Sequence, residues 1–256
     1  MKSYKKFLSY SYEPFRLHFC GPRDLASLKI IDDYLWGKKI SNKKIENVAK
    51  EFVGVYPYLK LIAKKNGLEP LDKQVIEAYW LGNSLLKQVT VDDLKTLVLK
   101  NFIGQGRLSQ AEAEESAENI PARATAHHSF HVLYIGSVTN TVQLVGKMLD
   151  LCRISWGKII KIPNSIKLGS TKSQIPNLLI KYRPLILKQN EIRLSRDEEE
   201  KEIKWNQKIL PKITEGQIVS FHWDLACEVL SEDQVRNLEK YTIRNVEAVN
   251  NLENRN

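Results

Sequence analysis

The sequence predicts an α+β protein in two parts: an all-helical domain over about residues 1–150, then a small β-barrel domain over 151–256 that ends in a helix. In the first half, apolar residues recur at helical spacing. After Cys152 they fall instead into short, Ile-rich runs separated by Pro, Asn or Gly, which is typical of barrel or sandwich strands. With 43% hydrophobic residues in a chain of 256, a substantial core can be buried.

Four segments of the first half carry helix signals. Ser41 and Thr90 are candidate N-caps, and Gly67 is a candidate C-cap. The expected helical segments are 23–35, 41–67, 72–89 and 90–104.

Residues 104–126 are polar and rich in Ala and Glu, so they form either a mobile connection or a short surface helix. Apolar segments at 127–138 and 141–152 follow, and the second has helical spacing. The strand signals come next, and Ser231 then caps a closing helix. The expected strand segments are 153–162, 165–170, 178–187, 191–196, 199–205 and 216–230.

Charge and cysteine content narrow the classes of protein. The net charge is +9, but the lysines are scattered and often lie beside acids, so specific nucleic-acid binding is not favoured. Three cysteines do not make an even disulfide framework and indicate reduced thiols. No apolar run approaches the length of a membrane span. We therefore expect a cytoplasmic protein without a membrane partner.

The five histidines occur in distinctive contexts. In HHSFH, His127 and His131 are four residues apart, and His128 and His131 are three apart, so either pair could share a helix face and bind a metal ion. No Glu follows the first His, so the zinc-protease pattern is absent. The alternative is one buried histidine and two exposed ones near a helix start.

A second candidate is HFCGPRD, where His18 and Cys20 precede a Gly-Pro turn and a helix. A thiol and an imidazole so close together could ligate a soft metal, and a cysteine at a helix N-terminus is more thiolate-like. The alternative is a packed turn with a small buried thiol.

Two motifs of the second half carry a resemblance. CRISWGKIIKI begins at Cys152 and leads into a strand, and EGQIVSFHWDLACEVLSEDQV carries His222 at a strand end before an acidic helix start. This half resembles the HypC/HybG family of [NiFe]-hydrogenase maturation chaperones, whose cysteine, strand, histidine and helix follow the same outline. Trp156 and Gln217 replace a proline and an aspartate of the family pattern, and the cysteine is internal rather than N-terminal. The first half resembles no characterised family.

The resemblance implies an OB-like barrel and a maturation factor that binds iron, or an Fe(CN)2CO fragment, through Cys152 and His222. The expected partners are the hydrogenase large subunit or other maturation proteins. The helical domain would then dock a partner or supply a ligand, with His128, His131, His18 and Cys20 as secondary metal candidates.

Two alternatives remain open. One is a metal-dependent enzyme whose site lies in the helical domain. The other is an OB-like nucleic-acid-binding protein, which would need exposed aromatic side chains for base stacking. A pocket in EAYWLGN is a further option, against the simpler interpretation of a core helix. The aromatic candidates for stacking are Trp156, Tyr182, Trp205, Phe221 and Trp223, and the pocket candidates are Glu77, Tyr79, Trp80 and Asn83.

Overall fold

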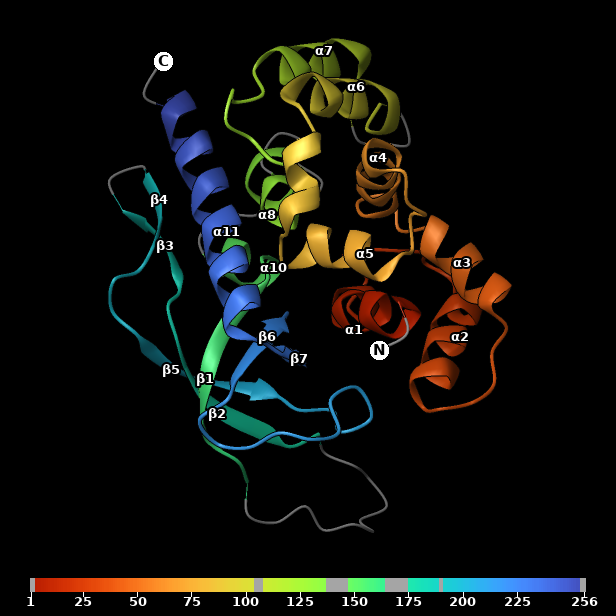
Figure 1. Cartoon of the computed structure of the whole chain (residues 1–256), viewed down its shortest axis with the longest axis vertical. Helices are drawn as coiled ribbons and strands as arrows, with labels where there is room; N and C mark the ends of the chain where they lie inside the picture. The colour runs from red at the N-terminus through yellow and green to blue at the C-terminus, as the bar shows by residue number, and fades with distance from the viewer. Residues whose placement is uncertain (1–2, 104–107, 137–146, 164–174, 189–190, 254–256) are drawn as a thin grey trace.

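The computed structural model describes residues 3–103, 108–136, 147–163, 175–188 and 191–253 (Figure 1). Within this part of the chain, every strand follows Cys152, and the helices precede it except for a long closing helix. The mixed helix-then-strand order confirms the α+β class.

The helices begin and end mostly where the caps predict. Ser41 and Thr90 accept hydrogen bonds from the first turns of their helices, and Gly67 ends another in a left-handed conformation. The α-helices are α1 Ser3–Arg16, α2 Leu25–Leu35, α3 Asn42–Lys50, α4 Tyr56–Asn66, α5 Lys73–Trp80, α6 Val91–Asn101, α7 Gln110–Glu118, α8 His128–Phe130, α10 Lys147–Cys152 and α11 Glu232–Glu253; η1 Ser84–Gln88 is a 3-10 helix and η2 His131–Ile135 a π-helical turn.

Five strands close into a barrel in the order β1-β2-β5-β7-β6, with β1 also pairing with β6. All pairs are antiparallel except the parallel pair β5 and β7. A second sheet contains only β3 and β4. The strands are β1 Ser155–Lys161, β2 Asn177–Tyr182, β3 Leu185–Lys188, β4 Glu191–Leu194, β5 Glu199–Lys204, β6 Ile218–His222 and β7 Leu225–Val229. The strand expected at 165–170 lies outside the described residues. The segments 178–187 and 216–230 were each expected as one strand, but each contains two, β2 with β3 and β6 with β7.

Helix α1 was not expected from the sequence, yet it lies between α5 and strands β6 and β7 near the middle of the molecule (Figure 1). Its apolar pattern is interrupted because Lys6 and Glu13 are buried and Pro14 lies inside the helix. The charge of Lys6 is offset by Glu77 and Glu228, at 2.7 and 3.1 Å, and this triad joins the helical and strand halves of the chain.

Three expectations for the helical half need correction or refinement. The segment 41–67 is not one helix, because α3 ends at Lys50 and α4 begins at Tyr56. The segment 72–89 is not one helix, because α5 stops before Gly82, which is left-handed with φ 84°. The polar segment 104–126 contains α7, so from residue 108 onward the short surface helix describes it better than a mobile connection.

One apolar core continues across the expected boundary at residue 150. It includes α1, α4, α5 and the inward face of α11, together with Leu185, Leu225 and Cys227 of the strand half. The barrel interior forms a second cluster around Ile159, Leu178 and Phe221. The helical part and the barrel are therefore packed against each other through apolar side chains, and the division into two domains stays a prediction.

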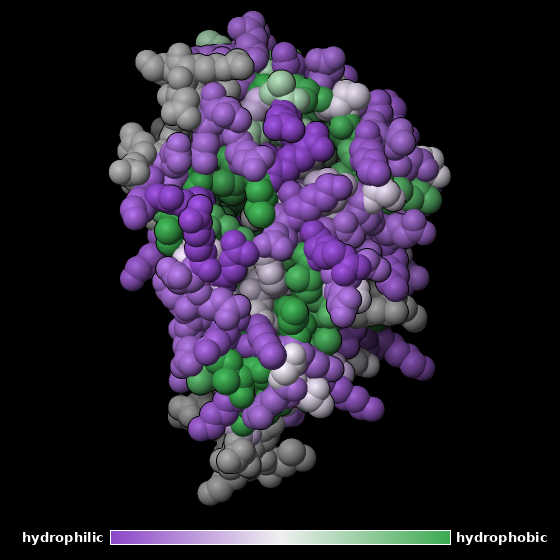
Figure 2. Space-filling model, turned by 60° about the vertical axis from the view of Figure 1, so that its left-hand side comes forward, coloured by the Kyte–Doolittle hydropathy of each residue, from purple (hydrophilic) through white to green (hydrophobic). Residues whose placement is uncertain are grey.

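The surface is mainly hydrophilic on the face in Figure 2, with apolar side chains gathered in separate patches. Among the described residues, no helix is both long enough and apolar enough to cross a membrane.

Gly82 and Gly37 allow a matched test of packing against α11. Both have φ 84°, but a Cβ at Gly82 would overlap the ring of Tyr241, whereas a Cβ at Gly37 meets nothing within 4 Å. We expect Gly37→Ala to cost about 1 kcal/mol of unfolding free energy for the backbone alone. Gly82→Ala should cost about 2 kcal/mol more because of overpacking. Equal losses in urea denaturation would contradict the described packing.

Candidate metal centre

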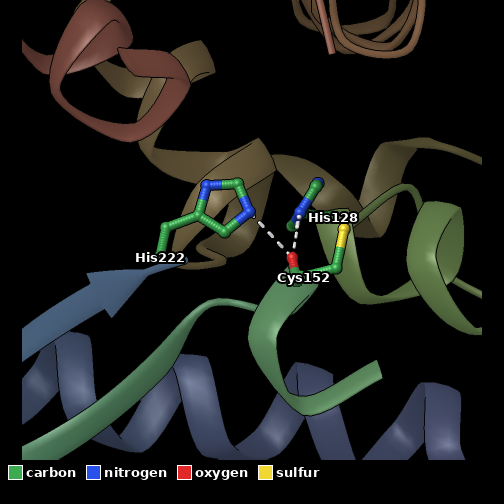
Figure 3. A group of neighbouring side chains, drawn as sticks. All are labelled: His128, Cys152 and His222. Atoms are coloured by element: carbon green, nitrogen blue, oxygen red, sulfur yellow. Dashed lines mark hydrogen bonds between the residues drawn. The ribbon is translucent and has the colours of Figure 1, made fainter. Parts of the chain in front are cut away.

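Three side chains from separate elements meet at the junction of the helical part and the barrel. They are His128 of α8, Cys152 at the end of α10 and His222 at the end of β6 (Figure 3). One ligand atom from each, an imidazole nitrogen or the thiol sulfur, lies within 4.8 Å of both others. Such a group could hold a metal ion. The two residues expected to bind metal in the barrel half therefore lie together, and His128 joins them.

Local structure fixes each of these residues. The backbone N–H of Trp223 donates to the carbonyl of Leu151 at 3.0 Å, which ties the end of β6 to the end of α10. Cys152 is the last residue of its helix, so its carbonyl lacks a partner within the helix. His127 caps α8 by accepting a hydrogen bond from the backbone N–H of Ser129.

A proline in α1 favours protonation of His222 at Nδ1. In an α-helix the carbonyl of Tyr10 would accept from the N–H of residue 14, but Pro14 has none. Nδ1 of His222 lies 2.7 Å from that carbonyl oxygen, so an Nδ1–H supplies the missing donor. Nε2 of His222 then carries a lone pair, and it lies 2.8 Å from the carbonyl oxygen of Cys152.

Neutral His222 cannot donate to both carbonyls, because a neutral imidazole carries one N–H. Burial lowers its pKa to about 4, so the ring is neutral at physiological pH. If Nε2 held the proton instead, the Tyr10 carbonyl would face a bare nitrogen at 2.7 Å. A cation on the Nε2 side removes this conflict.

His128 is held in a parallel way. Its Nδ1 lies 3.0 Å from the hydroxyl oxygen of Tyr79, and that hydroxyl donates to the carbonyl of Gly54. Nε2 of His128 lies 2.9 Å from the carbonyl oxygen of Cys152, a hydrogen bond in the metal-free protein (Figure 3), and a bound metal ion would take the place of the proton on that nitrogen. With the Tyr79 proton donated to Gly54, the Tyr79 oxygen would then accept Nδ1–H of His128.

The site thus gathers electron-pair donors in a buried place. Two imidazole nitrogens and one carbonyl oxygen converge, with the Cys152 sulfur beside them. Burial lowers the pKa of His128 well below its usual value and raises the pKa of the Cys152 thiol to about 12, an effect that nearby Cys20 increases. A bound metal ion would supply the positive charge that favours the thiolate.

Aromatic side chains form one wall of this centre. The ring of Trp80 lies 4.7 Å from that of His128 and 5.8 Å from that of His222, measured between centroids. Trp80 and Tyr79 are almost fully buried, so EAYWLGN contributes core packing, as the simpler interpretation held. Tyr79 is in addition the hydrogen-bond partner of a candidate ligand, which the sequence did not indicate.

The other metal candidates lie outside the three-residue group. The ring of His131 is 6.3 Å from that of His128, and a Cβ at Gly54 would lie 2.9 Å from its Nε2, so that nitrogen faces the backbone. His18 is exposed on the turn after α1, with φ 63°. Cys20 is partly buried and close enough to Cys152 to raise the pKa of that thiol. The geometry therefore selects His128 from the secondary candidates.

The aromatic residues considered for base stacking are mostly not available to a ligand. Tyr182, Trp205, Phe221 and Trp223 are at most 6% exposed, and Trp156 is partly buried. They lie in the barrel interior or between the barrel and neighbouring elements, and do not form an exposed stacking surface.

Comparison with known proteins places almost the whole chain in one family. Residues 2–256 match the family described as "Family of unknown function (DUF6390)". No curated protein and no solved structure matches the chain. The protein with this imidazole and thiol centre therefore belongs to the DUF6390 family of unknown function.

Proposed function

We propose that this protein binds a transition metal through His128, Cys152 and His222 and acts as a metallocentre-assembly factor in the maturation of [NiFe]-hydrogenase. Its cargo would be iron or an Fe(CN)2CO fragment. The observation that carries the metal-binding step is the pair of carbonyl contacts made by His222, which one neutral imidazole cannot both satisfy.

The donor set suits a soft or borderline metal. Thiolate and imidazole together favour iron, copper, nickel or zinc over magnesium or calcium, which prefer oxygen ligands. Three side-chain ligands leave coordination positions for further ligands, as a carrier of a partly assembled metal fragment requires.

The barrel supports the proposal that the process is [NiFe]-hydrogenase maturation. By the resemblance, Cys152 and His222 would correspond to the iron-binding cysteine and histidine of the HypC/HybG pattern, and a ligand atom of each lies within 4.8 Å of the other. A closed five-stranded barrel has the size of an OB fold, which that resemblance implies. His128 would be an addition to the family pattern, supplied by the helical half.

The helical part then has a specific role under this proposal. It contributes His128 as a ligand and, through the carbonyl of Tyr10, the group that orients His222. These contacts favour ligand supply to the barrel as the role of the helical part. They also favour a junction site over a separate enzyme site within the helices.

Metal analysis and infrared spectroscopy test the proposed function directly. Protein purified without oxygen from cells that make active hydrogenase should contain iron and show bands in the cyanide and carbonyl stretching regions. Cys152→Ala should lose both, because it removes the thiolate ligand. Cys227→Ala is the matched control: this buried thiol contacts the backbone of Ser9, Leu225 and His222 but is not among the candidate ligands, so its loss should leave iron and bands in place.

Two results would count against the proposal in different ways. Iron without the infrared bands would support the metal site and reject the Fe(CN)2CO cargo. Neither iron nor bands in the wild-type protein would reject the maturation role.

Pro14→Ala tests how the ligand His222 is oriented. The new N–H at residue 14 would compete for the carbonyl of Tyr10 and release Nδ1 of His222 from its fixed role. We expect metal affinity to fall about 10-fold or more, as for other partners of ligating histidines. Competition with a chromophoric chelator measures this affinity. An unchanged affinity in a folded variant would show that Pro14 does not set the tautomer.

A further inference from the structure

We propose that Trp223 is a positioning residue of this centre, whose indole N–H donates a hydrogen bond to the Cys152 sulfur when that sulfur is a metal-bound thiolate. This inference rests on the proposed metal site and concerns a residue that is not itself a ligand. It makes the turn after β6 part of the metal centre.

The backbone places Trp223 beside the thiol. Trp223 and Asp224 form the two-residue turn between β6 and β7, and both have positive φ, at 51° and 59°. That conformation is uncommon for residues other than glycine, and paired positive φ values are those of a type I′ hairpin turn. The hydrogen bond from the Trp223 N–H to Leu151 then fixes the turn next to Cys152.

A second aromatic ring holds the indole from outside. Phe19 stacks on Trp223 with ring centroids 4.1 Å apart and an angle of 19° between the planes. Phe19 is 43% exposed, whereas Trp223 is 6% exposed, so the indole lies beneath the phenyl ring. The segment that carries Cys20 therefore also covers this side of the site.

The indole N–H of Trp223 is a buried hydrogen-bond donor that is not satisfied. Nε1 of Trp223 is buried and forms no conventional hydrogen bond with any described group. A buried N–H without a partner carries a desolvation penalty, so its retention calls for an explanation. The Cys152 thiol is the adjacent candidate, because the backbone of Trp223 is hydrogen-bonded to Leu151, the residue before Cys152, and the Trp223 side chain is close enough to the sulfur to interact with it.

A thiol is a weak acceptor, but a thiolate accepts charge-assisted hydrogen bonds. The contact would therefore strengthen when a metal ion replaces the thiol proton. An N–H donor stabilises the sulfur lone pairs, which orients the ligand and tunes the electronic state of the metal.

Cobalt(II) provides a direct optical probe of the sulfur. Anaerobic wild-type protein loaded with Co(II) should show a thiolate-to-cobalt charge-transfer band. Trp223→Phe keeps an aromatic ring that can stack on Phe19 but lacks the indole N–H. We expect its band to move to lower energy, because the sulfur lone pairs lose the hydrogen bond, and Co(II) affinity to fall about 10-fold.

Trp205→Phe is the matched control, because Nε1 of Trp205 donates to the carbonyl of Leu210 inside the barrel. It should leave the charge-transfer band in place. A Trp223→Phe band at the wild-type energy would overturn the role of Trp223 while leaving the metal site standing. The absence of a thiolate band in the wild-type protein would overturn both proposals.

A measurement on the unaltered protein covers the case in which Trp223→Phe does not fold. In protein labelled with ¹⁵N at tryptophan, the indole N–H signal of Trp223, assigned through the contact of its ring with Phe19 and so distinguished from that of Trp80 beside the site, should move downfield on Zn(II) binding. No such movement in zinc-loaded protein would contradict the hydrogen bond to the thiolate.

Discussion

A missing backbone donor in α1 shapes the candidate metal centre. Pro14 leaves the carbonyl of Tyr10 without its helical partner, and His222 supplies the substitute. This contact favours donation from Nδ1, which leaves Nε2 available as a ligand atom. Metal-ligating histidines commonly have this arrangement, with the second ring nitrogen bound to a carbonyl or carboxylate.

The rest of the fold brings that imidazole to its neighbours. The buried Lys6, paired with Glu77 and Glu228, holds α1 between α5 and the barrel. The β6–β7 turn places His222 at the end of α10, where Cys152 offers its sulfur and a helix-terminal carbonyl that Nε2 of both histidines approaches. The centre therefore depends on contacts between the helical part and the barrel, and neither part contains all three ligands.

Some features of the fold and of the candidate site could be predicted from the sequence and others could not, and the difference is physical. Caps such as Thr90 and the alternating Ile-rich strands are local signals, so the helix-then-strand order could be predicted. Cys152 and His222 could be predicted because they lie in recognisable sequence motifs. The choice of His128 over His131 depends on which ring faces α10, and only the tertiary structure shows this. Helix α1 escaped prediction because its buried charges and Pro14 break the apolar period. The role of Trp223 had no sequence signal, because only the folded turn places its indole beside the thiol.

X-ray absorption spectroscopy of the metal-loaded protein tests the central claim most directly, since it counts the atoms bound to the metal. With Zn(II), the account predicts one sulfur at about 2.3 Å and two imidazole nitrogens at about 2.0 Å. The sulfur should disappear in Cys152→Ala and one imidazole in His128→Ala. A shell of oxygen atoms without sulfur or imidazole would contradict the claim that these three residues form the metal centre.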